Sequence, residues 1–126
     1  MLKIEGKRIF LTRGDECTIT ITFKLKPKTQ NDEYALKTGD IVAFSIYNKK
    51  GFDKKPLLLK EVLIAEPTNT VDICLVSEDT KIGNIENKSV DYWYEVQINY
   101  NRTILGYDSD GPKIFTLYPE GDDSDE

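Results

Sequence analysis

The main pattern along this chain is an alternation of apolar and polar residues with a period of two. It is clearest in residues 17–25, where every second residue is Cys, Ile, Phe or Leu and the residues between are threonine or lysine. Successive side chains of a β-strand point to opposite faces, so this segment predicts a strand with one buried side. Similar shorter runs predict seven or eight strands in total, the others being 9–11, 41–47, 57–64, 71–76, 92–100, 102–107 and 113–118.

Turn-forming residues separate these runs, and no segment of useful length has the 3.6-residue period of a helix. Regularly spaced short strands of this kind predict an all-β fold, an antiparallel β-sandwich or barrel. One short helical turn is expected after Ser77, which would cap it. The tripeptide Arg13-Gly14-Asp15 occurs in integrin ligands, but its position between two strands and its turn-forming residues favour a simple strand connection.

Charge is distributed unevenly. The chain has 17 basic and 22 acidic residues, and five of the acids lie in the last seven residues. We therefore expect a single domain over 1–119 and an acidic, disordered tail over 120–126. Residues 24–60 are rich in lysine and residues 61–119 are rich in acids. Opposite fields of this kind can attract and favour head-to-tail contact between copies, but the favoured interpretation is ordinary solvated surface.

Several classes of partner and chemistry are not expected. An acidic total with few arginines argues against nucleic-acid binding, and no apolar stretch is long enough for a membrane span. The chain has no histidine and no phosphate-binding or nucleophile motif, so we expect no enzyme, no cofactor and no metal site. Cys17 and Cys74 lie in apolar runs without CxxC spacing, which favours two small buried side chains. A disulfide between them stays open.

The candidate binding residues lie on the strand 92–100. Alternation places Tyr92, Tyr94, Val96, Ile98 and Tyr100 toward the core and puts Trp93, Glu95 and Gln97 on the outer face. A large aromatic among polar neighbours is typical of an interface anchor or a sugar-stacking platform. The alternative is that the loop 84–90 or a neighbouring strand covers the tryptophan. An electrostatic rim is predicted on the loop 49–55, formed by Lys49, Lys50, Lys54 and Lys55.

Five further segments occur in a recognisable order. They are F-L-T-R-G-D (10–15), L-K-T-G-D (36–40), P-L-L-L-K (56–60), S-E-D-T-K (77–81) and Y-W-Y-E-V-Q-I (92–98). In this order the chain resembles small tail-associated proteins of phages and prophages of Gram-positive bacteria, and is similar to the N-terminal domain of baseplate upper proteins. The similarity covers most of residues 8–118. Differences are Glu95 in place of an aspartate, a longer segment 82–91 and the acidic tail.

The resemblance implies an immunoglobulin-like β-sandwich and a non-enzymatic structural or adaptor role in a virion. The protein would be made in a bacterial cytoplasm and then assembled into the tail tip or baseplate. Its partners would be other virion subunits, and itself as a further candidate. Two alternatives are a carbohydrate-binding module for host surface glycans and a phage-encoded inhibitor of a host defence protein.

Overall fold

The computed structural model describes residues 2–23, 34–48, 55–83, 88–106 and 109–119. Within these residues the chain forms nine strands and one short 3₁₀ helix, η1, over Ser77–Thr80. The strands are β1 (Leu2–Glu5), β2 (Arg8–Thr12), β3 (Cys17–Thr22), β4 (Ile41–Tyr47), β5 (Leu58–Leu63), β6 (Thr70–Leu75), β7 (Val90–Ile98), β8 (Arg102–Leu105) and β9 (Lys113–Tyr118). The predicted all-β class is confirmed. The acidic tail 120–126 lies outside the described residues.

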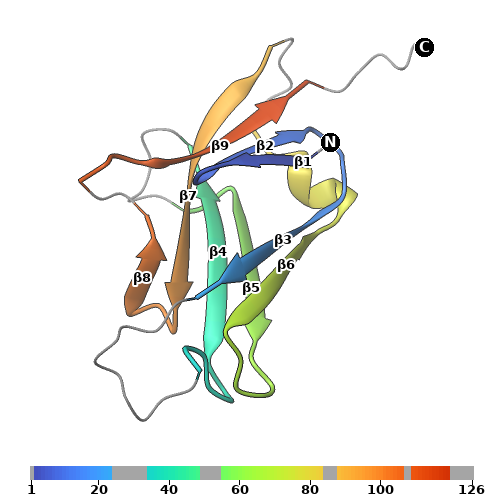
Figure 1. Cartoon of the computed structure of the whole chain (residues 1–126). Coiled ribbons are helices and arrows are strands. Elements are labelled where there is room, and N and C mark those ends of the chain that lie inside the picture. The colour runs from blue at the N-terminus through green and yellow to red at the C-terminus, as the bar shows by residue number, and fades with distance from the viewer. Residues whose placement is uncertain (1, 24–33, 49–54, 84–87, 107–108, 120–126) are drawn as a thin grey trace.

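The strands form two layers (Figure 1). Seven strands make a large sheet in the order β1-β2-β9-β7-β4-β5, and β8 pairs with one half of β7. The second layer is the antiparallel pair of β3 and β6, which crosses in front of β4 and β5.

The expectation of an antiparallel immunoglobulin-like sandwich is wrong in one respect, because the large sheet is mixed. Strands β2 and β9 pair in parallel, with Ile9 opposite Phe115 and Thr12 opposite Tyr118. Adjacent strands joined by a tight turn must be antiparallel, but nearly the whole chain separates β2 from β9. No hairpin therefore fixes their relative direction, and local sequence signals could not reveal it.

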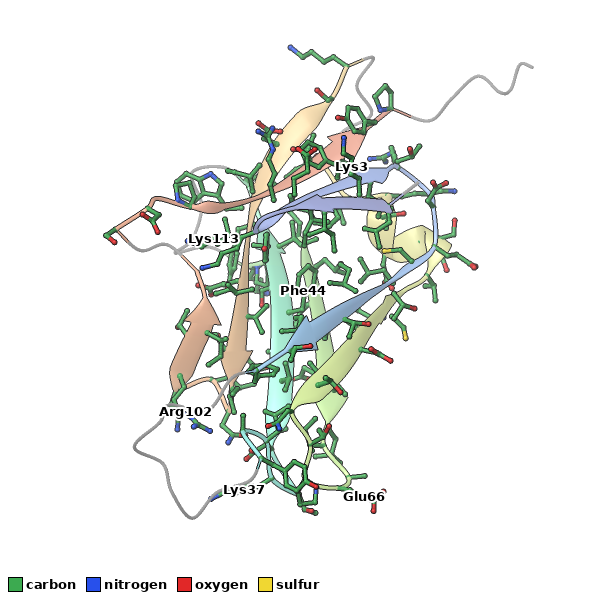
Figure 2. All side chains as sticks on the ribbon, viewed as in Figure 1. Lys3, Lys37, Phe44, Glu66, Arg102 and Lys113 are labelled. Atoms are coloured by element: carbon green, nitrogen blue, oxygen red, sulfur yellow. The ribbon has the colours of Figure 1, made fainter. Side chains whose placement is uncertain are left out.

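The core lies between the two layers. Phe44 of β4 is fully buried at its centre and packs against Tyr94 and Phe115, with ring centroids 5.6 Å and 6.4 Å away (Figure 2). Ile19 of β3 and Ile73 of β6 close the core from the small sheet. The predicted inward face of β7 is confirmed, since its tyrosines at 92 and 94, Val96 and Ile98 are all buried. By contrast Tyr100, predicted to face the core, is 48% exposed in the turn after β7.

The first strand and the two cysteines differ from expectation. Strand β1 was not predicted, since its four residues are all exposed and are too few to show a period. Cys74 is exposed and Cys17 half-buried, and both are free thiols. Cys17 pairs with inward-facing Leu75, whereas Cys74 pairs with outward-facing Thr18. The two sulfurs therefore lie on opposite faces of one sheet, which argues against a disulfide.

Helix η1 begins differently from the expectation. Its N-cap is Val76, whose backbone N–H donates to the Asp79 carboxylate at 2.9 Å. Ser77 does not cap the helix; its hydroxyl donates instead to the Gly14 carbonyl oxygen at 2.7 Å. The Ser77 hydroxyl, which the local sequence predicts as a helix cap, therefore forms a tertiary hydrogen bond instead.

Candidate interaction face

The outer face of the large sheet, on the side away from β3 and β6, carries the three candidate residues of β7. Strand pairing arranges this face in rows across β7, β4 and β5. One row joins Trp93 to Tyr47, the next joins Glu95 to Ser45 and Leu59, and the third joins Gln97 to Ala43 and Glu61. Trp93, Glu95 and Gln97 are thus brought together on one surface, as alternation predicts. We call the surface formed by these three rows and Leu63 the outer face.

Trp93 is half-buried rather than fully exposed. Its partners in the sheet are Tyr47 on β4 and Ile114 on β9, and its indole nitrogen is buried. Neighbouring strands therefore flank this side chain. Half-burial leaves less ring surface for stacking on a sugar, but is compatible with the rim of a protein interface.

Glu95 forms a small polar cluster with Tyr47. Burial raises the pKa of the Glu95 carboxyl above its ordinary value, while a hydrogen bond with Tyr47 works in the opposite direction. Burial and the nearby Glu95 charge raise the pKa of the Tyr47 hydroxyl. Gly106 lies against this cluster, because a Cβ added there would stand 3.5 Å from the Glu95 carboxylate oxygen. The cluster gives the outer face a carboxylate that is partly withdrawn from water.

The most exposed apolar side chains of this face lie on β5. Leu63 is 68% exposed and Leu59 is 43% exposed, and pairing with β4 places both on the outer face. Nearby, the Tyr100 hydroxyl donates to the Glu61 carboxylate, which raises the pKa of Tyr100 to about 12. The sequence pattern did not reveal the β5 leucines, because a run of three leucines does not show which of them face the core.

The predicted lysine rim is only partly within the described residues. Lys55 is exposed at the start of the segment leading into β5. Lys49, Lys50 and Lys54 lie outside the described residues, so the structure does not place the rim relative to the outer face.

The Arg13-Gly14-Asp15 turn is bound to η1 and the segment after it. Arg13 donates to the Ile82 and Lys81 carbonyl oxygens at 2.6 Å and 3.2 Å. The Gly14 N–H donates to the buried Thr80 hydroxyl at 2.9 Å, and that hydroxyl donates to the Asp15 carbonyl at 3.0 Å. These contacts use the arginine internally, which supports a strand connection rather than an adhesion site.

A second turn, at Gly39-Asp40, is fixed in a similar way at the other end of the sheet. The Asp40 carboxylate accepts hydrogen bonds from the Lys37 N–H at 2.8 Å and from the Asn99 side chain at 3.0 Å. These two bonds lower the pKa of Asp40. Asn99 in turn accepts from the Ile41 N–H at 2.9 Å. Segments 10–15 and 36–40 therefore both include residues that hold strand connections together.

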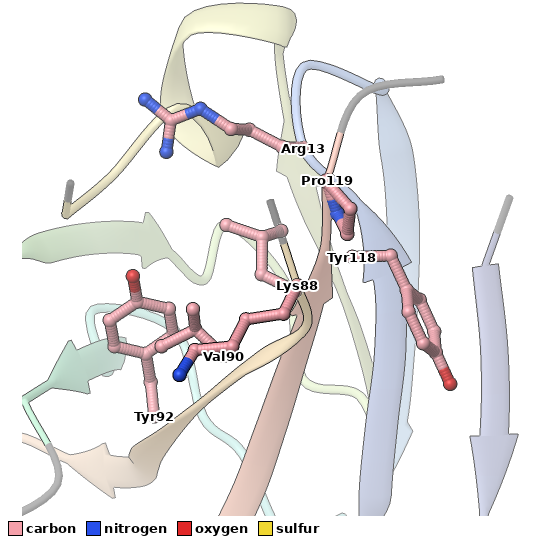
Figure 3. Close-up of a pocket in the computed structure, with 7 residues that line it drawn as sticks. Arg13, Lys88, Val90, Tyr92, Tyr118 and Pro119 are labelled. Atoms are coloured by element: carbon pink, nitrogen blue, oxygen red, sulfur yellow. The ribbon is translucent and has the colours of Figure 1, made fainter. Parts of the chain in front are cut away.

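A small concavity lies beside the Arg13-Gly14-Asp15 turn, between β7 and β9 (Figure 3). Its lining includes Arg13, Lys88, Tyr92 and Tyr118, and its volume is about 10 Å³. That volume holds roughly one water molecule, so it offers no site for a larger ligand.

The described residues show neither a metal centre nor a membrane-spanning helix. No group of three or more cysteine, aspartate and glutamate side chains gathers there as a metal centre would require. The described part of the chain also contains no helix with the length and hydrophobicity of a membrane span.

The comparisons with known proteins leave the family open. No protein-family model matches the chain, and neither a curated protein nor a solved structure matches it significantly.

Proposed function

We propose that this chain is a non-enzymatic structural protein of a phage or prophage particle, which docks to neighbouring virion subunits through the outer face. The virion context rests on the order of motifs described above. The docking role rests on the outer face itself, where β5 carries exposed leucines and β7, on the other side of β4, carries the half-buried Trp93, Glu95 and Gln97.

The observation that carries the docking role is the exposure of Leu63 and Leu59 on one side of β5. Scattered apolar residues are normal on any protein surface, but these two share a face with Trp93 and Tyr100. A protein interface typically has an apolar and aromatic centre with a polar rim. Glu61, Glu95 and Gln97 would supply polar rim contacts around the leucines. Repeated subunits in a particle make weak individual contacts sufficient.

The decisive experiment uses purified particles of the phage or induced prophage that encodes the chain. Mass spectrometry of these particles is expected to detect the chain at a stoichiometry typical of a structural component. Particles produced with Leu63→Glu or Trp93→Ala are expected to lose most of the chain. The matched control is Val76→Glu, because Val76 is 51% exposed but precedes η1, away from the outer face.

Two results would contradict the proposal in different ways. If purified particles of the unaltered phage lack the chain, the virion role is wrong. If the chain is present but Leu63→Glu and Val76→Glu are incorporated equally, the docking surface is wrong while the virion role stands.

A further inference from the structure

Strand β1 is an edge strand with unusual self-complementarity. In the described residues it pairs only with β2, and all four of its residues are exposed. Leu2 and Ile4 are 37% and 48% exposed on the inner side, and Lys3 and Glu5 alternate with them on the outer side. An unpaired edge that carries apolar residues is a template for another strand.

The hairpin between β1 and β2 shows which backbone groups face outward. Glu5 and Arg8 close a two-residue turn in which Gly6 has φ of 61°. The residues that close such a turn exchange hydrogen bonds, and hydrogen-bonded pairs alternate along an antiparallel ladder. Lys3 and Glu5 therefore direct their backbone groups toward β2. Leu2 and Ile4 direct theirs toward the free edge.

This arrangement restricts how two copies of β1 can pair side by side in antiparallel fashion. A register that keeps the outward-directed backbone groups opposite each other can be centred on any residue of β1, but centring on Leu2 would pair only Leu2 within the strand. Centring on Lys3 or on Glu5 places that residue opposite its own copy, so like charges meet. Centring on Ile4 places Lys3 of each copy opposite Glu5 of the other. Opposite charges stabilise such cross-strand pairs and like charges destabilise them, so the charges select the register centred on Ile4.

An apolar cavity lies along the same edge. It has a volume of about 240 Å³ and lies between the β1–β2 hairpin and β3. Its apolar lining includes Ile4, Ile9, Ile19, Phe44, Tyr94 and Leu105. In the register centred on Ile4, the second copy's Ile4 lies beside the first on the inner side of the sheet. Two isoleucines would then cover apolar surface that one leaves open.

We propose that β1 is a homodimerisation edge, and that its occupant is β1 of a second copy of this chain, paired antiparallel about a two-fold axis at Ile4. The large sheets of the two copies become continuous across this axis. Two short strands form a small contact, so the dimer is weak and depends on protein concentration. It is independent of the outer face, which lies on β4, β5 and β7.

Charge exchange tests the register directly. Sedimentation velocity of the full chain, from about 1 µM to about 1 mM, is expected to show a mass rising from 14.4 kDa toward twice that value. Lys3→Glu and Glu5→Lys are each expected to weaken the dimer about tenfold, since each variant places like charges opposite each other in both cross-strand pairs. An equimolar mixture of the two variants restores two opposite-charge pairs and is expected to restore association as a heterodimer.

A disulfide trap provides a second, independent test in a background with Cys17→Ala and Cys74→Ser. Ile4→Cys is expected to form a covalent dimer on mild oxidation, because Cα atoms of a hydrogen-bonded antiparallel pair are about 5.5 Å apart, within disulfide range. Lys3→Cys is the matched control, since two copies of residue 3 would lie diagonally, at roughly 7–8 Å. Circular dichroism verifies that each variant is folded.

Different results would overturn the dimer itself and its register. An unaltered chain that stays monomeric over the whole concentration range overturns the proposal. So does association that Lys3→Glu leaves unchanged, or a mixture of the two charge variants that stays monomeric. Equal cross-linking of Ile4→Cys and Lys3→Cys overturns the register. None of these results bears on the virion role or on docking through the outer face.

Discussion

The Thr80 hydroxyl oxygen accepts a hydrogen bond from the Gly14 backbone nitrogen at 2.9 Å, and this bond joins η1 to the turn between β2 and β3. Thr80 is 1% exposed, so its polar atom is withdrawn from water. The same hydroxyl donates to the Asp15 carbonyl at 3.0 Å, across a sequence separation of 65 residues. One buried side chain therefore accepts from one backbone group of a distant turn and shares its single hydroxyl proton between the Asp15 carbonyl and, at 3.1 Å, the Ser77 carbonyl.

The first prediction concerns this threonine. Thr80→Val keeps the shape of the side chain but leaves the Gly14 N–H without its acceptor. We therefore expect the free energy of unfolding to fall by about 1–3 kcal/mol. Urea denaturation followed by tryptophan fluorescence measures the change. Thr18→Val, on the exposed face of β3, is the control and is expected to stay within about 0.5 kcal/mol of the unaltered chain. Equal effects of the two substitutions would contradict the role of the Thr80 bond.

The second prediction concerns pH and Glu95. Burial raises the folded-state pKa of Glu95 above its ordinary 4.5, so ionisation of this group opposes folding. This free-energy cost of ionisation is absent well below pH 4.5, develops as the pH rises from 4.5 to the folded-state pKa and is complete above it. We therefore expect Glu95→Gln to raise stability at about pH 7 relative to the unaltered chain and to leave it nearly unchanged at about pH 3.

Paired urea titrations at these two pH values test the Glu95 prediction, with Glu78→Gln as the control at an exposed position. A Glu95→Gln stability gain that is equally large at both pH values would show that burial of the charge is not the cause. The expected gain is modest, because the carboxyl retains partial contact with solvent and a hydrogen bond with Tyr47.

The third prediction concerns Gly83. Its φ is 69°, and a Cβ at this position would overlap the Tyr92 hydroxyl and stand 3.1 Å from the ring carbon that bears it. Tyr92 is 3% exposed in the core, so it has little freedom to move away. We expect Gly83→Ala to destabilise the fold by about 1–3 kcal/mol through backbone strain and overpacking together.

Gly6→Ala separates these two causes. Gly6 has a similar φ of 61°, but no atom lies within 4 Å of the position that a Cβ would take there. This substitution therefore introduces backbone strain without steric overlap. We expect it to lower the melting temperature by less than Gly83→Ala does. If both variants lower the melting temperature by the same amount, overlap with Tyr92 does not contribute to the destabilisation caused by Gly83→Ala.

The fourth prediction concerns the two thiols. Cys74 is exposed, whereas burial raises the pKa of the half-buried Cys17 thiol and reduces its thiolate fraction. In the folded chain at about pH 8, a thiol reagent is expected to label Cys74 rapidly and Cys17 slowly, and Cys74→Ser is expected to remove the fast phase. In denaturant both thiols should react. A single slow phase for both thiols in the folded chain would contradict the assigned exposure.

Part of the candidate site was predictable from residues alone. The alternation in 92–98 placed Trp93, Glu95 and Gln97 on one face because period two is a local property of an extended backbone. The half-burial of Trp93 was not predictable, since it depends on β4 and β9, which supply Tyr47 and Ile114. The β5 leucines at 59 and 63 were missed for a different reason, since a run of leucines does not show which of them face the core.

The sequence by itself determined which segments extend, because the spacing of apolar side chains and the turn residues act over a few positions. It determined that Tyr94 and Val96 of β7 face the core. Only the tertiary structure decided that β2 and β9 lie parallel, that Cys74 is exposed and that Ser77 bonds to Gly14. Each of these depends on contacts between distant segments, which compete with local preference and here prevail over it.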